Sequence, residues 1–130
     1  MGRVFLVDLG NRTHYRCRLC ESPLALIDDV LSRSFTCSRG RALLFNKVVN
    51  VTVGPQEERI MISGMHTVED VFCCCCGQII GWKYVTVHDK NQKKYKEGKI
   101  VLERWRITVT GLTEGFNLDS HSGSSDAETP

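Results

Sequence analysis

Long hydrophobic segments are absent from this sequence of 130 residues. Outside the cysteine run at 71–76, no purely apolar stretch exceeds four residues, whereas a helix that spans a bilayer needs about 20. The apolar residues Val4–Val7 are followed at once by Asp8, which leaves too short a segment for the core of a secretion signal. We therefore expect no membrane partner and no export, and we expect an intracellular protein.

Basic residues are missing from the C-terminal stretch 107–130, which contains four acidic residues. Residues 1–106 therefore hold all 17 Lys and Arg against 11 acidic residues, a formal charge of +6. This is mild basicity, short of the concentrated basic face that binding to phosphates needs, so nucleic acid is not the expected partner. Residues 111–130 are rich in Ser, Gly and acidic groups, and they predict a disordered tail after a domain at residues 1–110.

Sustained helical periodicity is also absent. Four segments have the alternating or β-branched pattern of strands, at residues 47–53, 59–63, 78–88 and 99–110. Gly54-Pro55 is interpreted as the turn between the first two, and the polar residues 89–98 as a hairpin loop between the last two. Residues 24–31 fit either a turn of helix or a strand. Short connections favour antiparallel pairing, so the predicted fold class is mostly β.

Seven cysteines are many for a chain of this length, and an odd number without a secretion signal argues against a disulfide framework. Two Cys-x-x-Cys pairs, Cys17 with Cys20 and Cys73 with Cys76, have the spacing of zinc-binding turns. We predict one structural Zn²⁺ bound by these four thiolates. Because 52 residues separate the pairs, the metal joins two distant hairpins of one domain.

The other thiols receive no metal in this interpretation. Cys74 and Cys75 occupy the apex of the second turn and are predicted to be free thiols, and Cys37 is predicted to be a small buried side chain. Four protein ligands leave no open position on the metal for a catalytic water. An enzyme that uses a thiolate among residues 73–76 with a histidine base is an alternative, but metal binding explains the thiols better. We therefore expect no catalysis.

Several blocks beyond the cysteines follow a recognisable pattern. They are Gly40–Asn46, Val48–Val51, Gly54–Arg59, Gly81–Tyr84 and Lys94–Lys99. With the two cysteine pairs, they closely resemble the Yippee family over about residues 14–104. The resemblance implies a β-tent, in which two antiparallel sheets meet at an angle and are pinned by zinc, as in the ligand-binding domain of cereblon.

The resemblance also implies a function in binding. Yippee proteins are nuclear or centrosome-associated, so we expect a nuclear or cytoplasmic protein-interaction module with protein partners such as ubiquitin-ligase components. Trp82 and Tyr84 lie two apart on a strand and share a face. With Asn46 and His66 they form a predicted pocket for a small molecule or a peptide, although Trp82 also fits a position in the core.

A nucleic-acid-associated protein is the alternative function. Its basis is a group of lysines in one predicted loop: Lys90, Lys93, Lys94, Lys96 and Lys99. The same lysines fit a hairpin tip that is simply solvated.

Overall fold

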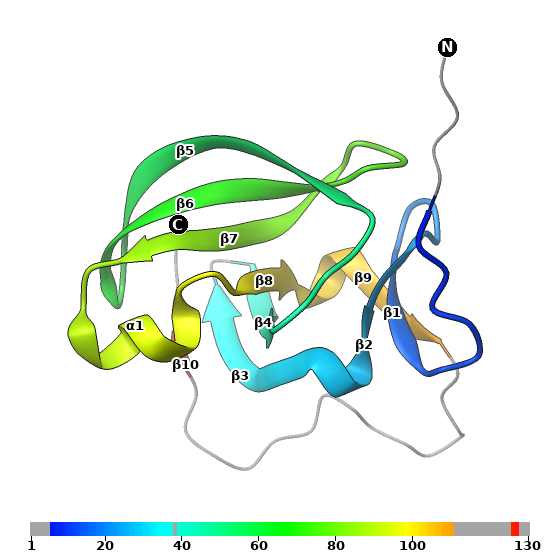
Figure 1. Cartoon of the computed structure of the whole chain (residues 1–130), viewed down its shortest axis with the longest axis horizontal. Helices are drawn as coiled ribbons and strands as arrows, with labels where there is room; N and C mark the ends of the chain where they lie inside the picture. The colour runs from blue at the N-terminus through cyan, green and yellow to red at the C-terminus, as the bar shows by residue number, and fades with distance from the viewer. Residues whose placement is uncertain (1–5, 38, 111–125, 128–130) are drawn as a thin grey trace.

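The protein is described by a computed structural model that covers residues 6–37, 39–110 and 126–127 (Figure 1). The strands are β1 (His14–Cys17), β2 (Pro23–Leu26), β3 (Val30–Cys37), β4 (Gly40–Phe45), β5 (Val51–Met61), β6 (Gly64–Cys73), β7 (Ile79–Val87), β8 (Ile100–Glu103), β9 (Ile107–Thr110) and β10 (Asp126–Ala127). One helix, α1 (Lys90–Lys96), and two short turns, η1 (Ile27–Asp29) and η2 (Arg104–Arg106), complete the described elements.

The strands form two sheets, which lie toward opposite ends of the molecule (Figure 1). The smaller sheet has the order β2-β1-β9, so a strand near the start of the chain lies between its sequence neighbour and a strand near residue 110. The larger sheet has the order β10-β3-β4-β8-β7-β6-β5, and its pairs from β3 to β5 are antiparallel. The predicted class, mostly β with two antiparallel sheets, is confirmed.

The predicted turn at Gly54-Pro55 is wrong. These residues lie inside β5, where the pairing with β6 shifts between Val53 and Gln56. The shift is a bulge at the edge of the sheet, the usual place for a proline that has no N–H to donate. The real hairpin turn follows Met61, and Gly64 at its end has a φ of 123°.

The segment predicted as one strand at 99–110 is two strands in different sheets. Arg104–Arg106 form the turn η2, which ends β8 in the larger sheet and starts β9 in the smaller one. The predicted loop at 89–98 contains α1, which is too short to show helical periodicity. Residues 24–31 hold both predicted alternatives, a strand and a single helical turn. Of the predicted tail, only Asp126–Ala127 lie within the described residues.

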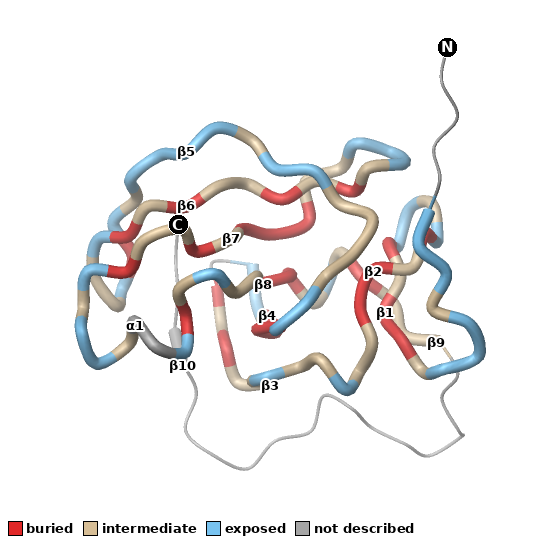
Figure 2. The backbone as a smooth tube through the Cα atoms, viewed as in Figure 1, coloured by how far each residue is buried: buried red, intermediate tan, exposed pale blue. Residues whose placement is uncertain are grey.

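The core consists of two clusters that share the central strands. The zinc-side cluster is Tyr15, Cys17, Leu24, Ala25, Leu43, Phe45, Val71, Cys73, Ile80, Leu102 and Ile107. The helix-side cluster is Phe35, Cys37, Ala42, Leu44, Met61, Val68, Trp82, Tyr84, Val87 and Val101. Neighbouring residues of β4 and β8 enter opposite clusters, so both faces of these strands are buried (Figure 2).

Candidate metal centre and binding surfaces

Two matching turns hold the cysteine pairs. In the first, the Cys17 carbonyl accepts the amide N–H of Glu21 at 2.8 Å; in the second, the Cys73 carbonyl accepts that of Gly77 at 2.9 Å. The residue that donates has a left-handed backbone in both turns, with a φ of 63° at Glu21 and 78° at Gly77. Both turns therefore fold the chain in the same way, and each brings two sulfur atoms to one side.

The four sulfur atoms converge, and all lie within 4.8 Å of one another. Cys17 Sγ lies 3.7 Å from Cys76 Sγ, and Cys20 Sγ lies 3.4 Å from Cys73 Sγ. Four sulfurs placed at about 2.3 Å from one Zn²⁺ in a tetrahedron are about 3.8 Å apart. The residues present therefore fit a single structural zinc, as the spacing of the cysteines predicts.

The surroundings of the sulfurs make it costly to hold all four as thiolates without a cation. Burial raises the pKa of Cys17 to about 12, although backbone amides of its own turn favour the thiolate, and burial raises the pKa of Cys73 as well. Burial acts on Cys20 in the same direction, but hydrogen bonds from Ser22 prevail and lower the pKa of Cys20 to about 6. Several thiolates this close repel one another unless a divalent metal neutralises them.

The remaining cysteines lie outside this group of four. Cys74 is half-buried and Cys75 is exposed, next to two of the ligands. Cys37 is buried in the helix-side cluster, and its thiol donates to Glu103 Oε2 at 3.4 Å. The structure thus gives Cys37 the buried place that the sequence predicts.

Asn50 supports the second turn, a role that reasoning from the sequence did not assign to it. Its side-chain amide accepts from Val7 N at 2.7 Å and donates to Pro23 O at 2.7 Å, and its own carbonyl accepts the amide of Cys74 at 3.0 Å. The backbone of Asn50 is left-handed, with a φ of 60°. Asparagine tolerates this conformation better than most residues, which was the one available signal.

Three of the four residues predicted to line an aromatic pocket lie together, but they are buried in the interior of the domain. The rings of Trp82 and Tyr84 meet edge to face with centroids 6.4 Å apart, and Tyr84 meets His66 in the same way at 5.5 Å. All three side chains are buried, with Trp82 only 2% exposed. Asn46 is exposed just after β4, where its backbone N–H donates to the Asp29 carbonyl at 2.8 Å. Recognition of a ligand by these four residues stays a prediction.

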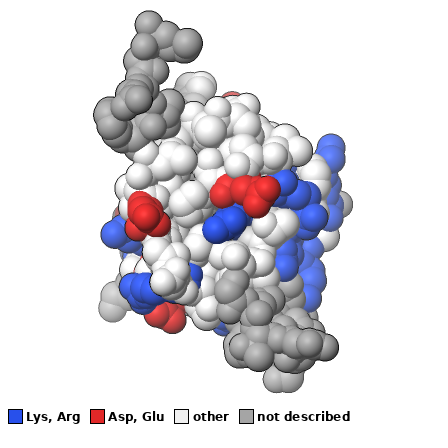
Figure 3. All heavy atoms as spheres, turned by 90° about the vertical axis from the view of Figure 1, so that its right-hand side faces the viewer, with Lys and Arg blue, Asp and Glu red and all other residues white. Residues whose placement is uncertain are grey.

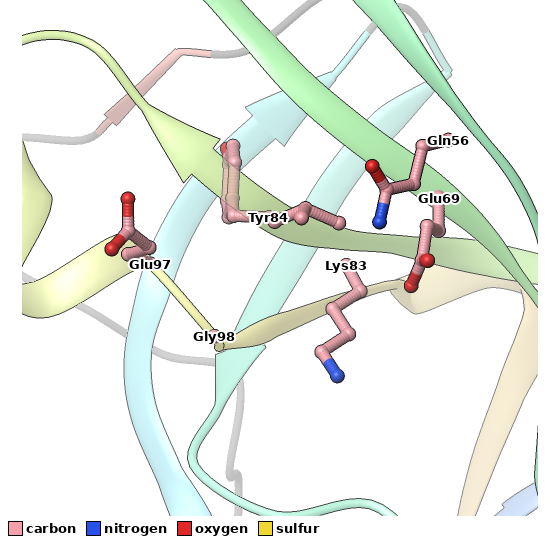
Figure 4. A pocket seen from close by; sticks show the side chains of 7 residues that line it. Gln56, Glu69, Lys83, Tyr84, Glu97 and Gly98 are labelled. Atoms are coloured by element: carbon pink, nitrogen blue, oxygen red, sulfur yellow. The ribbon is translucent and has the colours of Figure 1, made fainter.

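A groove of about 400 Å³ opens on strands β5, β6 and β7 beside the end of α1 (Figure 4). It is lined by Gln56, Glu69, Lys83, Tyr84, Val85, Glu97 and Gly98. In the strand register Glu69 lies between Gln56 and Lys83, so three polar side chains cross the floor. No sequence motif marks this groove, because its residues come from four separate segments.

Arginines gather around an exposed tryptophan at η2. Trp105 is 38% exposed, and the guanidinium carbons of Arg106 and Arg39 lie 4.0 Å and 5.4 Å from its ring centroid. Arg18 Nε donates to the Trp105 carbonyl at 2.7 Å. We call these four residues the arginine–tryptophan surface. On the face of the molecule drawn in Figure 3, many Lys and Arg side chains lie along one edge, and others lie near the middle and at the opposite edge.

The predicted lysine loop has a different structure. Lys90 is exposed, but Lys96 points inward and is only 2% exposed. The side chains of residues 93 and 94 lie outside the described part. The lysines at 90, 96 and 99 therefore do not form one solvated hairpin tip.

These observations define a class of protein: a mostly β domain in which a closed four-cysteine zinc site joins two hairpins that lie far apart in the sequence. No helix in the described ranges is long and apolar enough to cross a membrane.

The sequence pattern of one family, described as "Yippee zinc-binding/DNA-binding /Mis18, centromere assembly", matches residues 13–121. The chain belongs to this Yippee/Mis18 family, which confirms the resemblance. It is 58% identical to a yippee-like protein of Arabidopsis thaliana over 129 residues, 98% of both chains. It is 49% identical to yippee-like protein 3 of Homo sapiens over 101 residues, which cover 78% of this chain and 82% of the human one. Neither of these two relatives carries the name of an enzyme.

A solved structure shows the same fold. The crystal structure of the Mis18 "Yippee-like" domain superposes with a TM-score of 0.62 and covers 78% of this chain and 98% of the other. The sequences are only 12% identical, so this likeness concerns the fold alone.

Proposed function

We propose that this protein is a non-catalytic interaction module of the nucleus or cytoplasm, which binds a segment of a partner protein in the groove of Figure 4. In this role it serves as a recognition subunit of a larger assembly, such as a ubiquitin ligase. The groove is the observation that carries the proposal. The zinc supports the architecture and has all its positions filled by cysteine, so binding is the activity that the arrangement favours.

The lining of the groove indicates the chemistry of the partner segment. Glu69 and Glu97 supply two carboxylates, and Gln56 supplies an amide that can donate or accept. Glu97 also accepts the Val87 amide at 3.0 Å, which fixes the end of α1 beside β7. Two acids against the single Lys83 favour a segment with a basic group.

A charge reversal in the groove tests this proposal. Affinity capture from cells, with mass spectrometry, is carried out with the full chain, with Glu69→Lys and with Asp28→Lys as the matched control. Asp28 lies on η1, its side chain is 70% exposed, and it pairs with Arg12 at the surface. We expect a partner that the wild type and Asp28→Lys share and Glu69→Lys loses, at unchanged zinc content.

The shared partner is then purified, and its binding is measured by calorimetry. We expect the affinity to fall about tenfold or more for Glu69→Lys, since like charge at a docking site costs several kcal/mol. Equal affinities of Glu69→Lys and Asp28→Lys would place the partner elsewhere on the molecule and refute the groove as its site.

Nucleic-acid binding is a second candidate, and the arginine–tryptophan surface favours it. Exposed Trp105 offers a face on which a base can stack, and Arg18 and Arg39 lie near it for contacts to phosphates. The family description includes DNA binding. The anisotropy of labelled single- and double-stranded DNA, titrated at 50 and 200 mM salt, tests this candidate. Absence of binding at the lower concentration, or equal binding by Trp105→Ala, would remove it.

A further inference from the structure

The ammonium group of Lys96 lies inside the protein among aromatic rings. Its Nζ is 5.4 Å from the ring centroid of Phe35, 5.5 Å from that of Tyr84 and 5.7 Å from that of Tyr95. These rings come from β3, β7 and α1. Nζ also donates to Gln92 Oε1 at 2.7 Å. An ammonium held within about 6 Å of several rings is the arrangement by which proteins recognise alkylammonium ligands.

A buried lysine is an unusual anchor for a short helix. Among the side chains of α1 that the structure describes, Lys96 is the buried one, and Lys90, Asn91 and Tyr95 are exposed. Taking an ammonium out of water is costly, whereas an apolar side chain of similar length would attach the helix without that cost. The rings offset part of this cost through their negative faces. The helix is thus held by contacts between an ammonium group and aromatic rings, and another cation can make the same contacts.

The groove and the rings around Lys96 meet at the end of α1. Tyr84 is in contact with both, but its buried ring alternates with Lys83 along β7 and so lies on the face of the strand opposite the groove floor. Glu97 and Gly98, which line the groove, directly follow Lys96, and the Gly98 N–H donates to the Tyr84 carbonyl at 2.8 Å. Gly98 has a φ of 83°, at the point where the chain leaves α1 for β8. A displacement of α1 therefore exposes these rings at the edge of the groove where α1 ends.

We propose that Phe35, Tyr84 and Tyr95 form a cage for alkylated ammonium groups, such as a methylated lysine of a partner segment, and that Lys96 is the internal occupant which this group displaces. This inference rests on the proposed function, because the partner segment that carries the alkylated ammonium is the one that binds in the groove. Methylation removes N–H donors and weakens hydration, so a methylated ammonium is easier to bring into the cage than the ammonium of Lys96.

Competition with an internal occupant makes a measurable prediction. While Lys96 fills the cage, the apparent affinity for an external cation is lowered by the fraction of molecules in which the cage is open. Tetramethylammonium is the probe, and it is titrated into the full zinc-loaded chain by NMR against sodium at equal ionic strength. We expect Lys96→Ala to bind the probe about tenfold more tightly than the wild type. This factor corresponds to a wild-type cage that is open in about one tenth of the molecules.

Matched variants separate this effect from a general change of charge. Lys90→Ala removes an exposed lysine from the same helix and should bind the probe as the wild type does. Gln92→Ala removes the acceptor of the Lys96 ammonium and should strengthen binding by a smaller factor. Tyr95→Leu, which removes a cage wall at a partly exposed position, should abolish the gain in the Lys96→Ala background.

Each outcome decides the inference. It is overturned if neither Lys96→Ala nor Gln92→Ala binds the probe more tightly than Lys90→Ala, or if Tyr95→Leu leaves the gain intact. Zinc content and a cooperative melt show that each variant is folded. Because the probe assay involves no partner protein, failure of the cage is distinguishable from failure of the groove. In the Lys96→Ala background, Glu69→Lys should leave probe binding unchanged.

Discussion

The zinc end and the α1 end of the domain both join chain segments that are far apart, but by different chemistry. At the zinc end, Cys17 and Cys73 belong to the core cluster itself, and the metal joins the turn after β1 to the turn after β6. At the α1 end, the ammonium of Lys96 lies against rings from β3 and β7. One end is held by coordination bonds and the other by contacts that can exchange.

The difference in strength is large. Structural zinc binds with about 10 to 16 kcal/mol in small peptides, which exceeds the roughly 4 kcal/mol needed to close a loop as long as the one between the cysteine pairs. A cation beside an aromatic ring contributes about 0.5 to 2 kcal/mol. The α1 end is therefore expected to open locally while the zinc end stays closed.

Removal of a zinc ligand should have the largest effect, because it removes the stronger of the two connections. Cys20→Ser leaves three thiolates, so we expect loss of the metal and of the cooperative melt. Native mass spectrometry gives the zinc content, and circular dichroism gives the melt. Cys75→Ser, in the second cysteine turn but outside the group of four sulfurs, should keep one zinc and a normal melt. Equal loss in both variants would show that the ligands are assigned wrongly.

Gly81→Ala should cause the next largest effect, at the point where β7 pairs with β8. A Cβ at this position would lie 1.8 Å from the Val101 carbonyl oxygen, so the backbones must separate. We expect a loss of about 3 kcal/mol or more of unfolding free energy, measured by urea denaturation. Gly54→Ala is the control, because its Cβ would lie 3.3 Å from a Phe72 ring atom that can move. A smaller loss for Gly81 than for Gly54 would contradict the geometry.

Asn50→Ala tests the zinc end without touching a ligand. The change removes three side-chain hydrogen bonds, two to the Val7 backbone and one to the Pro23 carbonyl, and places alanine at a left-handed φ. We expect a cost of about 2 to 3 kcal/mol, measured by urea denaturation, with one zinc retained. Asn46→Ala, at an exposed position, should cost little. Equal costs would mean that the Asn50 bonds contribute nothing.

Glu21→Gly should stabilise the protein slightly, because it gives the first cysteine turn the glycine that the second turn already has. Glu21 has the left-handed backbone that Gly77 adopts in the matching turn, at a cost of about 1 to 2 kcal/mol for a residue with a Cβ. The ion pair lost with Arg16, 3.5 Å long and at the surface, contributes little. We expect a gain of up to about 1 kcal/mol, seen as a higher Tm; a lower Tm would refute this account.

Local patterns were predictable and distant contacts were not. The four ligands and β7 could be identified because their signals lie within a few consecutive residues. Gly54-Pro55 was misinterpreted because the same residues serve a turn or a bulge, and only pairing with β6 decides between them. The inward direction of Lys96 depends on rings at Phe35 and Tyr84, which no local pattern connects to it.

The position of β1 between β2 and β9 has a consequence for synthesis of the chain. Ribosomes add about 5 to 20 residues per second, so the first cysteine pair waits several seconds for the second to be made. β1 waits longer still, because β9 ends at Thr110. A nascent chain therefore exposes one unpaired edge of β1 and two thiols during translation. We expect this protein to depend on chaperones and on free zinc while it is being made, more than a domain that folds segment by segment.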